Sequence, residues 1–201
     1  MKKVSLPDRI LFLITGHVAG FEIVKGLEGF DLLPAFYFTL AFGVLLLACL
    51  LLVLFGFKIL NSSSVIIITT FLPLCFSLGL VAKHQTNIHA CYLVFSVMGL
   101  ISIILSQNFT TKKTATIVLA FFHGIAGLLI VILPIIFAIK QILSPQVLLI
   151  GVGGACIGIV GLMFMFLKLR PSRALQNAID SSFALLLLLM TTAFVLGMRV
   201  V

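Results

Sequence analysis

Residues 33–58 read LPAFYFTLAFGVLLLACLLLVLFGFK and contain no charged side chain before Lys58. A helix rises 1.5 Å per residue, so about 20 consecutive apolar residues are enough to cross the hydrocarbon core of a bilayer. This stretch is long enough and apolar enough, and it predicts a transmembrane helix.

The composition of the whole chain supports the same interpretation. Of 201 residues, 62% are hydrophobic and 9% are charged, and the mean hydropathy is +1.36, whereas about 25% of the residues of an average soluble domain are charged. The 13 Lys/Arg and 5 Asp/Glu side chains are too few to cover a soluble domain of this size. We therefore expect an all-α integral membrane protein whose main partner is the lipid bilayer. The net charge of +8 fits loops near anionic headgroups, and we expect no nucleic-acid partner.

Apolar runs of spanning length are separated by short polar breaks along the chain. Seven runs are predicted, at about 10–27, 34–57, 64–82, 89–107, 114–139, 146–167 and 178–198. The first run contains His17, Glu22 and Lys25, so an alternative places it at the membrane interface and leaves six spans.

The distribution of basic residues distinguishes seven spans from six, because cytoplasmic loops carry the excess of Lys and Arg. With seven spans, one side of the membrane receives Lys2, Lys3, Arg9, Lys58, Lys112, Lys113, Lys168, Arg170 and Arg173, and the other receives Lys25, Lys83, Lys140 and Arg199. With seven spans the two sides carry nine and four basic residues, whereas with six spans they would carry seven and six. The count predicts seven spans, with the amino terminus cytoplasmic and the carboxyl terminus outside.

The chain also contains a predicted internal repeat. Three spans at about 10–82 correspond to three spans at about 114–198, and a linker span lies at 89–107. Pro34 and Pro145 each open the middle span of a unit, where a missing N–H costs little. The third spans are expected to begin at the polar segments NSSS (61–64) and NAIDSS, with Asp180 of the latter as a helix-start residue, and each contains a Thr pair.

A single linker span makes the two units parallel, related by an axis along the membrane normal. This 3+1+3 plan resembles the sugar-transporting SWEET proteins and the PQ-loop families in span count and order. The dipeptide Pro145–Gln146 stands at the start of the sixth span, whereas the motif of that family belongs to the first span of each unit. The resemblance therefore covers span order alone.

Two histidines stand at matching places in the two units. The segments LITGHVAG (13–20) and AFFHGIAG (120–127) contain His17 and His123, which lie about 10 and 13 Å into the membrane from the same side. Ionisable groups at this depth are candidates for function. The first hypothesis is a small-solute transporter or channel-like protein, with both rings facing a pathway between the units.

Two alternatives remain open for these histidines. They could be the two axial ligands of a haem b, in a subunit of a membrane electron-transfer complex. The two histidines could instead form hydrogen bonds between helices. The protein would then be a structural subunit that assembles with other membrane subunits or forms a homo-oligomer. Glu22 and Lys25, three residues apart, are expected to pair near the outer mouth, either as an interfacial ion pair or as a gate.

The remaining reactive side chains indicate no further site. His84 and His89 lie in the predicted outer loop KHQTNIHA (83–90), where they are expected to be solvated. The four cysteines have no CxxC spacing and are expected to be packing residues rather than metal ligands or disulfides. No hydrolase, metalloprotease or phosphate-binding motif occurs, so we expect no enzymatic activity.

Overall fold

The computed structural model describes residues 4–25 and 29–201. In this part of the chain it contains seven α-helices and two short 3-10 helices, and no β-strand. The helices are α1 (Leu6–Lys25), α2 (Leu32–Phe55), η1 (Gly56–Asn61), α3 (Ser63–His84), α4 (Thr86–Phe109), α5 (Lys112–Ile139), η2 (Pro145–Val147), α6 (Leu148–Leu169) and α7 (Arg173–Met198). Each predicted apolar run corresponds to one α-helix, and the last two positions of the first run, 26 and 27, lie outside the described residues.

Six of these helices, α2 to α7, are long and apolar enough to cross a membrane, as expected of an integral multi-pass protein. Helix α1 differs because charged residues lie in both of its terminal turns: Asp8 and Arg9 in the first, Glu22 and Lys25 in the last. The residues between Arg9 and Glu22 include no Asp, Glu, Lys or Arg. The all-α membrane class is confirmed, and the seven-span 3+1+3 arrangement stays a prediction.

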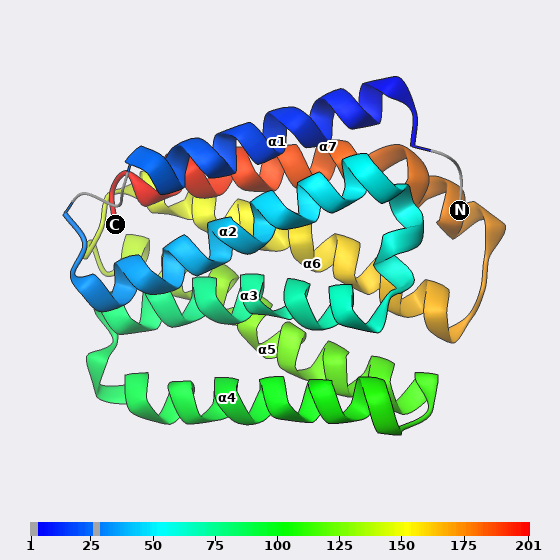
Figure 1. The fold of residues 1–201 in the computed structure, drawn as a ribbon. Helices are drawn as coiled ribbons and strands as arrows, with labels where there is room; N and C mark the ends of the chain where they lie inside the picture. The colour runs from blue at the N-terminus through cyan, green and yellow to red at the C-terminus, as the bar shows by residue number, and fades with distance from the viewer. Residues whose placement is uncertain (1–3, 26–28) are drawn as a thin grey trace.

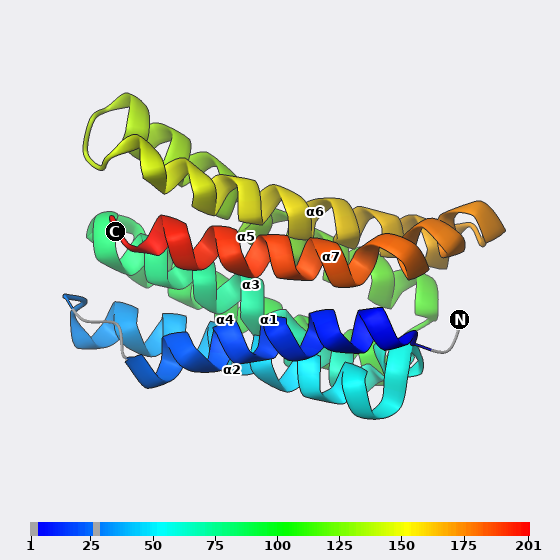
Figure 2. The same ribbon diagram turned by 90° about the horizontal axis from the view of Figure 1, so that it is seen from above.

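The helices form one elongated bundle in which each helix runs antiparallel to the one before it (Figures 1 and 2). Six helices pack as neighbours in a closed ring, in the order α1, α2, α3, α5, α6, α7 and back to α1. Helix α4 lies outside this ring and packs on α3 and α5. The ring therefore encloses an interior space, and the side chains that line this space decide what the bundle can bind.

The two ends of the bundle carry different numbers of basic residues, because the helices alternate in direction. Among the described residues, the end near the amino terminus carries Arg9, Lys58, Lys112, Lys113, Lys168, Arg170 and Arg173. The opposite end carries Lys25, Lys83, Lys140 and Arg199. Lys2 and Lys3, which also contribute to the predicted orientation, lie outside the described residues.

One predicted boundary is wrong. The sequence places Asp180 at the start of the last span, but α7 begins at Arg173, so Asp180 lies about two turns inside the helix. The helix starts earlier because the Ser172 hydroxyl accepts a hydrogen bond from the backbone N–H of Leu175 at 3.4 Å, which is an N-cap. Asp180 accepts a hydrogen bond from the Gln176 amide at 2.8 Å.

The first testable prediction concerns the path of α1. Figure 1 places the two chain ends at opposite ends of the bundle, and α1 runs beside α2 and α7, so we expect Ser5 and Val201 to face opposite sides of the membrane. Single-cysteine variants Ser5→Cys and Val201→Cys, made after replacement of the four native cysteines, can be treated with a membrane-impermeant maleimide on intact cells. Only Val201→Cys should react before permeabilisation.

Asn61→Cys and Gln141→Cys are the matched controls, because they report the two faces independently of α1. Asn61 follows α2 at the end expected to be cytoplasmic, and Gln141 follows α5 at the other end. Reaction of Ser5→Cys together with Gln141→Cys on intact cells would place α1 outside the membrane and leave six spans.

Candidate functional site

The interior of the helix ring contains a cavity of about 510 Å³, a volume typical of small-molecule sites. It lies between α2, α3, α5, α6 and α7. Its lining residues on the α-helices lie between Leu45 and Leu52 of α2, Ile66 and Pro73 of α3, Thr116 and Val131 of α5, Gly154 and Lys168 of α6, and Phe183 and Met190 of α7. The cavity therefore extends from the end of the bundle near the amino terminus, which is the end predicted to face the cytoplasm, to about the middle of the helices.

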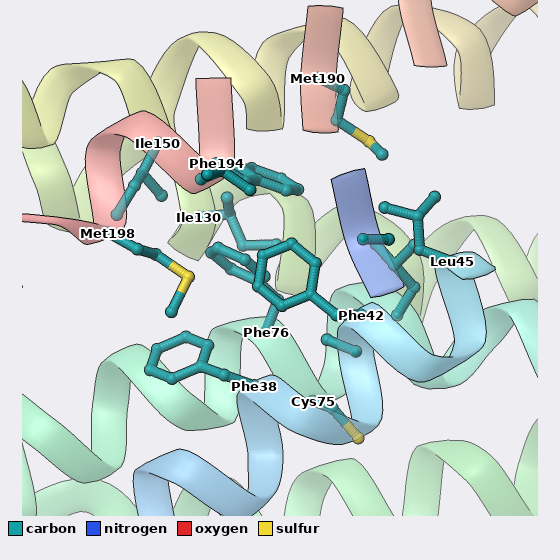
Figure 3. Close-up of a cluster of buried hydrophobic side chains, with 14 of the residues drawn as sticks. Phe38, Phe42, Leu45, Cys75, Phe76, Ile130, Ile150, Met190, Phe194 and Met198 are labelled. Carbon is teal, nitrogen blue, oxygen red and sulfur yellow. The ribbon is translucent and has the colours of Figure 1, made fainter. Parts of the chain in front are cut away.

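The other half of the ring is filled by four buried phenylalanines, which we call the aromatic plug: Phe38, Phe42, Phe76 and Phe194. The ring centroids of Phe76 and Phe194 lie 4.1 Å apart in a stacked pair, and those of Phe38 and Phe76 lie 5.2 Å apart, edge to face. Figure 3 shows these rings meeting inside the bundle beside Met198 and Ile130. The aromatic plug closes the cavity toward the carboxyl-terminal end.

Helices α5 and α6 are close at one end and separate at the other. A Cβ atom on Gly154 would lie 2.7 Å from Ile130, and one on Gly151 would lie 3.3 Å from the carbonyl oxygen of Val131. Toward the cavity the helices no longer touch at their glycines, and a Cβ atom would have nothing within 4 Å at Gly124, Gly127, Gly158 and Gly161. All four of these glycines line the cavity. We call this opening the α5–α6 gap.

His123 is a histidine of the cavity lining that lies well inside its helix. It lies 11 residues after Lys112, about 16 Å along α5 and near the middle of that helix. Its Nδ1 atom is buried and has no hydrogen-bond partner. Buried polar atoms without a partner are rare in folded proteins, and the binding of a ligand or a water molecule at that atom is one of the ordinary explanations.

The other polar lining residues are few: Thr69, Thr116, Cys156 and Lys168. The hydroxyls of Thr69 and Thr116 already donate to backbone carbonyls of their own helices. Pro73, which also lines the cavity, has no N–H with which to bond the Thr69 carbonyl four residues earlier. The helix continues through Pro73, so this one hydrogen bond is lost without a break in α3.

His17 does not lie in this cavity. It is exposed on the surface of α1, and α1 packs on α2 and α7 but not on α5 within the described residues. The structure therefore does not bring His17 and His123 together within one chain.

Glu22 and Lys25 are also remote from the cavity. Glu22 is buried, with 7% of its surface exposed, whereas Lys25 is exposed at the end of α1. Among residues 4–25 and 29–201 neither side chain lines the cavity, and no hydrogen bond or ion pair joins the two. Their assignment to a pathway or gate stays a prediction without support from this geometry.

The same arrangement bears on haem binding. A bis-histidine haem needs two imidazoles facing one another across the porphyrin ring, but His17 is exposed on the surface of α1 whereas His123 lines the cavity inside the bundle. The residues present therefore do not fit a haem ligated by this pair within one chain.

The segment KHQTNIHA is not the outer loop that the sequence predicts. Only Gln85 separates α3 from α4. The ring of His84 packs on Phe137 with centroids 4.8 Å apart, and Nε2 of His89 lies 3.3 Å from the Tyr37 hydroxyl. Both histidines are part of helix packing, and the described residues contain no cluster of three His, Cys, Asp or Glu side chains that could hold a metal ion. The four cysteines are free; Cys49 and Cys75 are buried, as expected of packing residues, whereas Cys91 is exposed.

The sequence pattern misses Lys168 as a site residue, because its position after an apolar run indicates only a cytoplasmic basic residue. The sequence feature that could have pointed to the cavity is the glycine-rich run GVGGACIGIVG (151–161), since glycines on one helix mark either close packing or open space.

Comparisons of the chain with protein-family models, with curated proteins and with solved structures found no match.

Proposed function

We propose that the protein is a small-solute transporter whose binding site is the cavity beside His123. The observation that carries the proposal is this cavity, which lies inside a ring of helices, five of them lining it and long enough to cross a membrane, and is closed on one side by the aromatic plug. A site near the middle of the membrane with access from one side is the arrangement that alternating access requires.

The neighbour relations of the helices support the predicted repeat. Exchanging α1, α2 and α3 with α5, α6 and α7 leaves the packing pattern of these six helices unchanged, because the α1–α7 contact becomes the α5–α3 contact. The cavity is lined by α2 and α3 of one unit and by all three helices of the other. This placement between two parallel units is typical of transporter sites.

The lining also indicates the kind of solute. No acidic residue among the described residues lines the cavity, so it offers no carboxylate for coupling to a proton or a sodium ion. The lining is mostly aliphatic, and a transported molecule must therefore have a substantial apolar part.

The test is flux through proteoliposomes containing the full chain, with a hexose, 1,2-hexanediol and octanesulfonate as probes. We expect at least one amphipathic probe to cross faster than in protein-free liposomes. His123→Ala should lower the flux of 1,2-hexanediol about tenfold, because a buried hydroxyl of this probe would lose its hydrogen-bond partner, which typically costs about 1–3 kcal/mol.

His17→Ala is the matched control, because it removes the same ring from an exposed position outside the cavity. It should leave the flux unchanged. Equal losses in both variants, or no flux of any probe above the protein-free rate, would contradict the proposal.

A further inference from the structure

We propose that the ligand of this cavity is an amphipathic anion, a single apolar chain with a carboxylate or phosphate headgroup, which enters from the bilayer through the α5–α6 gap. This inference deepens the proposed function and rests on it for the transport step, but the binding step can be tested separately. Three features of the described residues support it: the lining, the position of Lys168 and the shape of the gap.

The lining matches an apolar chain. Apart from its few polar residues, the cavity wall consists of aliphatic, glycine, methionine and phenylalanine residues, among them Leu52, Leu187 and Met165. The hydroxyls of Thr69 and Thr116 donate hydrogen bonds to backbone carbonyls of their own helices. They therefore have no free proton to donate to a polar ligand. A sugar or amino acid would leave many of its polar groups without a partner here, which costs free energy.

Lys168 supplies a charge at headgroup depth. It lies one residue before the end of α6, at the predicted cytoplasmic surface, and it lines the cavity. No acidic side chain lines the cavity with it, and within the described residues Lys168 has no hydrogen bond or ion pair. An ammonium group in this position binds carboxylate or phosphate oxygens by charge-assisted hydrogen bonds.

His123 lies deeper than this headgroup site. Counting residues from the ends of α5 and α6, its Cα is about 15 Å further along the bundle axis than that of Lys168. A headgroup at Lys168 therefore places the apolar chain, not the anion, at the level of His123. Anion selectivity should depend on Lys168 and be insensitive to His123.

The α5–α6 gap gives such a molecule a route from the membrane. A Cβ atom added to any of the four glycines that border it would meet no atom within 4 Å. Leu128 and Leu162, which line the cavity from the same two helices, are 59% and 53% exposed, so the cavity is not sealed where they lie. Both helices are long enough to cross the membrane, so the gap opens at the depth of lipid chains. A molecule already dissolved in the bilayer can enter without passing through water.

The first experiment measures binding to the purified full chain in nanodiscs, with radiolabelled palmitate, hexadecyl phosphate and hexadecanol as probes. The two anions share the headgroup chemistry, and hexadecanol has the same chain without charge. We expect both anions to bind more tightly than the alcohol. Lys168→Met should reduce this preference about tenfold, as the loss of a charge-assisted hydrogen bond implies, whereas Lys168→Arg should retain it.

The second experiment narrows the gap. Gly158→Leu places a side chain in the open space between α5 and α6, and it should slow the binding of all three probes. Gly43→Leu is the matched control, because a Cβ atom added to Gly43 would also meet nothing within 4 Å and Gly43 does not line the cavity. Its binding rates should equal those of the unaltered chain.

The results separate this inference from the proposed function. Equal affinity for hexadecanol and the two anions, unchanged in Lys168→Met, would overturn the anion site even if His123-dependent flux is observed. Unchanged binding rates in Gly158→Leu would overturn the lateral route. Anion binding that depends on Lys168, without any flux of octanesulfonate, would support the ligand class and reject transport.

Discussion

Replacing Gly197 by alanine is expected to destabilise the bundle by about 2 kcal/mol. A Cβ atom on this residue of α7 would lie 2.6 Å from Cγ1 of Ile150 and 2.8 Å from its backbone nitrogen. A side chain can rotate away, but the backbone of α6 can move only if the α6–α7 contact separates. Overpacking of this kind costs typically about 1–3 kcal/mol and occasionally more, and the gain in helix propensity of about 1 kcal/mol offsets part of it.

The buried thiols of Cys49 and Cys75, 1% and 5% exposed, can report unfolding in chains whose Cys91 and Cys156 are replaced by serine, because each buried thiol reacts with a maleimide dye once the bundle opens. For a chain of about 200 residues, a loss of 2 kcal/mol corresponds to a fall in Tm of about 4–8 °C. Gly43→Ala makes the same change where a Cβ atom meets nothing within 4 Å, and it should leave Tm unchanged or raise it slightly. An equal Tm for Gly197→Ala and Gly43→Ala would show that the α6–α7 contact is not as close as described.

Most of the fold could be predicted from the sequence, because a bilayer leaves little freedom. A backbone in hydrocarbon must bond within its own segment, so an apolar run of spanning length is a helix. The failures lie at helix ends, where this constraint no longer applies. Ser172 begins α7 ahead of its apolar run, and His84 and His89 lie in helices whose ends a hydropathy pattern cannot locate.

The candidate site could be predicted only in part, and the two histidine segments show why. Gly16 and Gly20 face α2, where a Cβ atom would lie 3.3 Å from Cys49 and 3.7 Å from Leu46, and this packing leaves His17 on the outside of α1. Gly124 and Gly127 face open space, and His123 lines the cavity beside them. Similar residues in a similar order serve close packing in one helix and a cavity in the other, because the neighbouring helix decides the outcome.

Phe76→Ala is expected to have the largest effect of the predicted substitutions, on both stability and flux. Phe76 is 1% exposed and stacks on Phe194, with further contacts to Phe38 and Phe42. Phe→Ala in a buried core costs about 3–5 kcal/mol in soluble proteins. In a bilayer the part of this cost that comes from excluding water is smaller, whereas the part that comes from lost packing contacts remains. We therefore expect the free energy of unfolding to fall by about 3 kcal/mol and Tm to fall by about 6–12 °C.

Phe166→Ala is the matched control for stability, because this ring on α6 is 55% exposed and its removal leaves no buried cavity. It should change the free energy of unfolding by less than about 0.5 kcal/mol. The two variants together separate the loss of the stack from any general effect of removing a phenylalanine, and equal Tm values for them would contradict a packed aromatic plug.

The same variant tests whether the aromatic plug is the gate of the proposed transporter. Phe76 closes the cavity on the side away from Lys168, so its removal should join the cavity to the opposite end of the bundle and raise passive leakage of 1,2-hexanediol through proteoliposomes, at a temperature where the variant is still folded. Increased leakage in Phe76→Ala together with reduced flux in His123→Ala would place Phe76 and His123 on the same route across the membrane. A stable, non-leaking Phe76→Ala protein would show that the plug serves packing alone, and the route across the membrane would have to lie elsewhere in the ring.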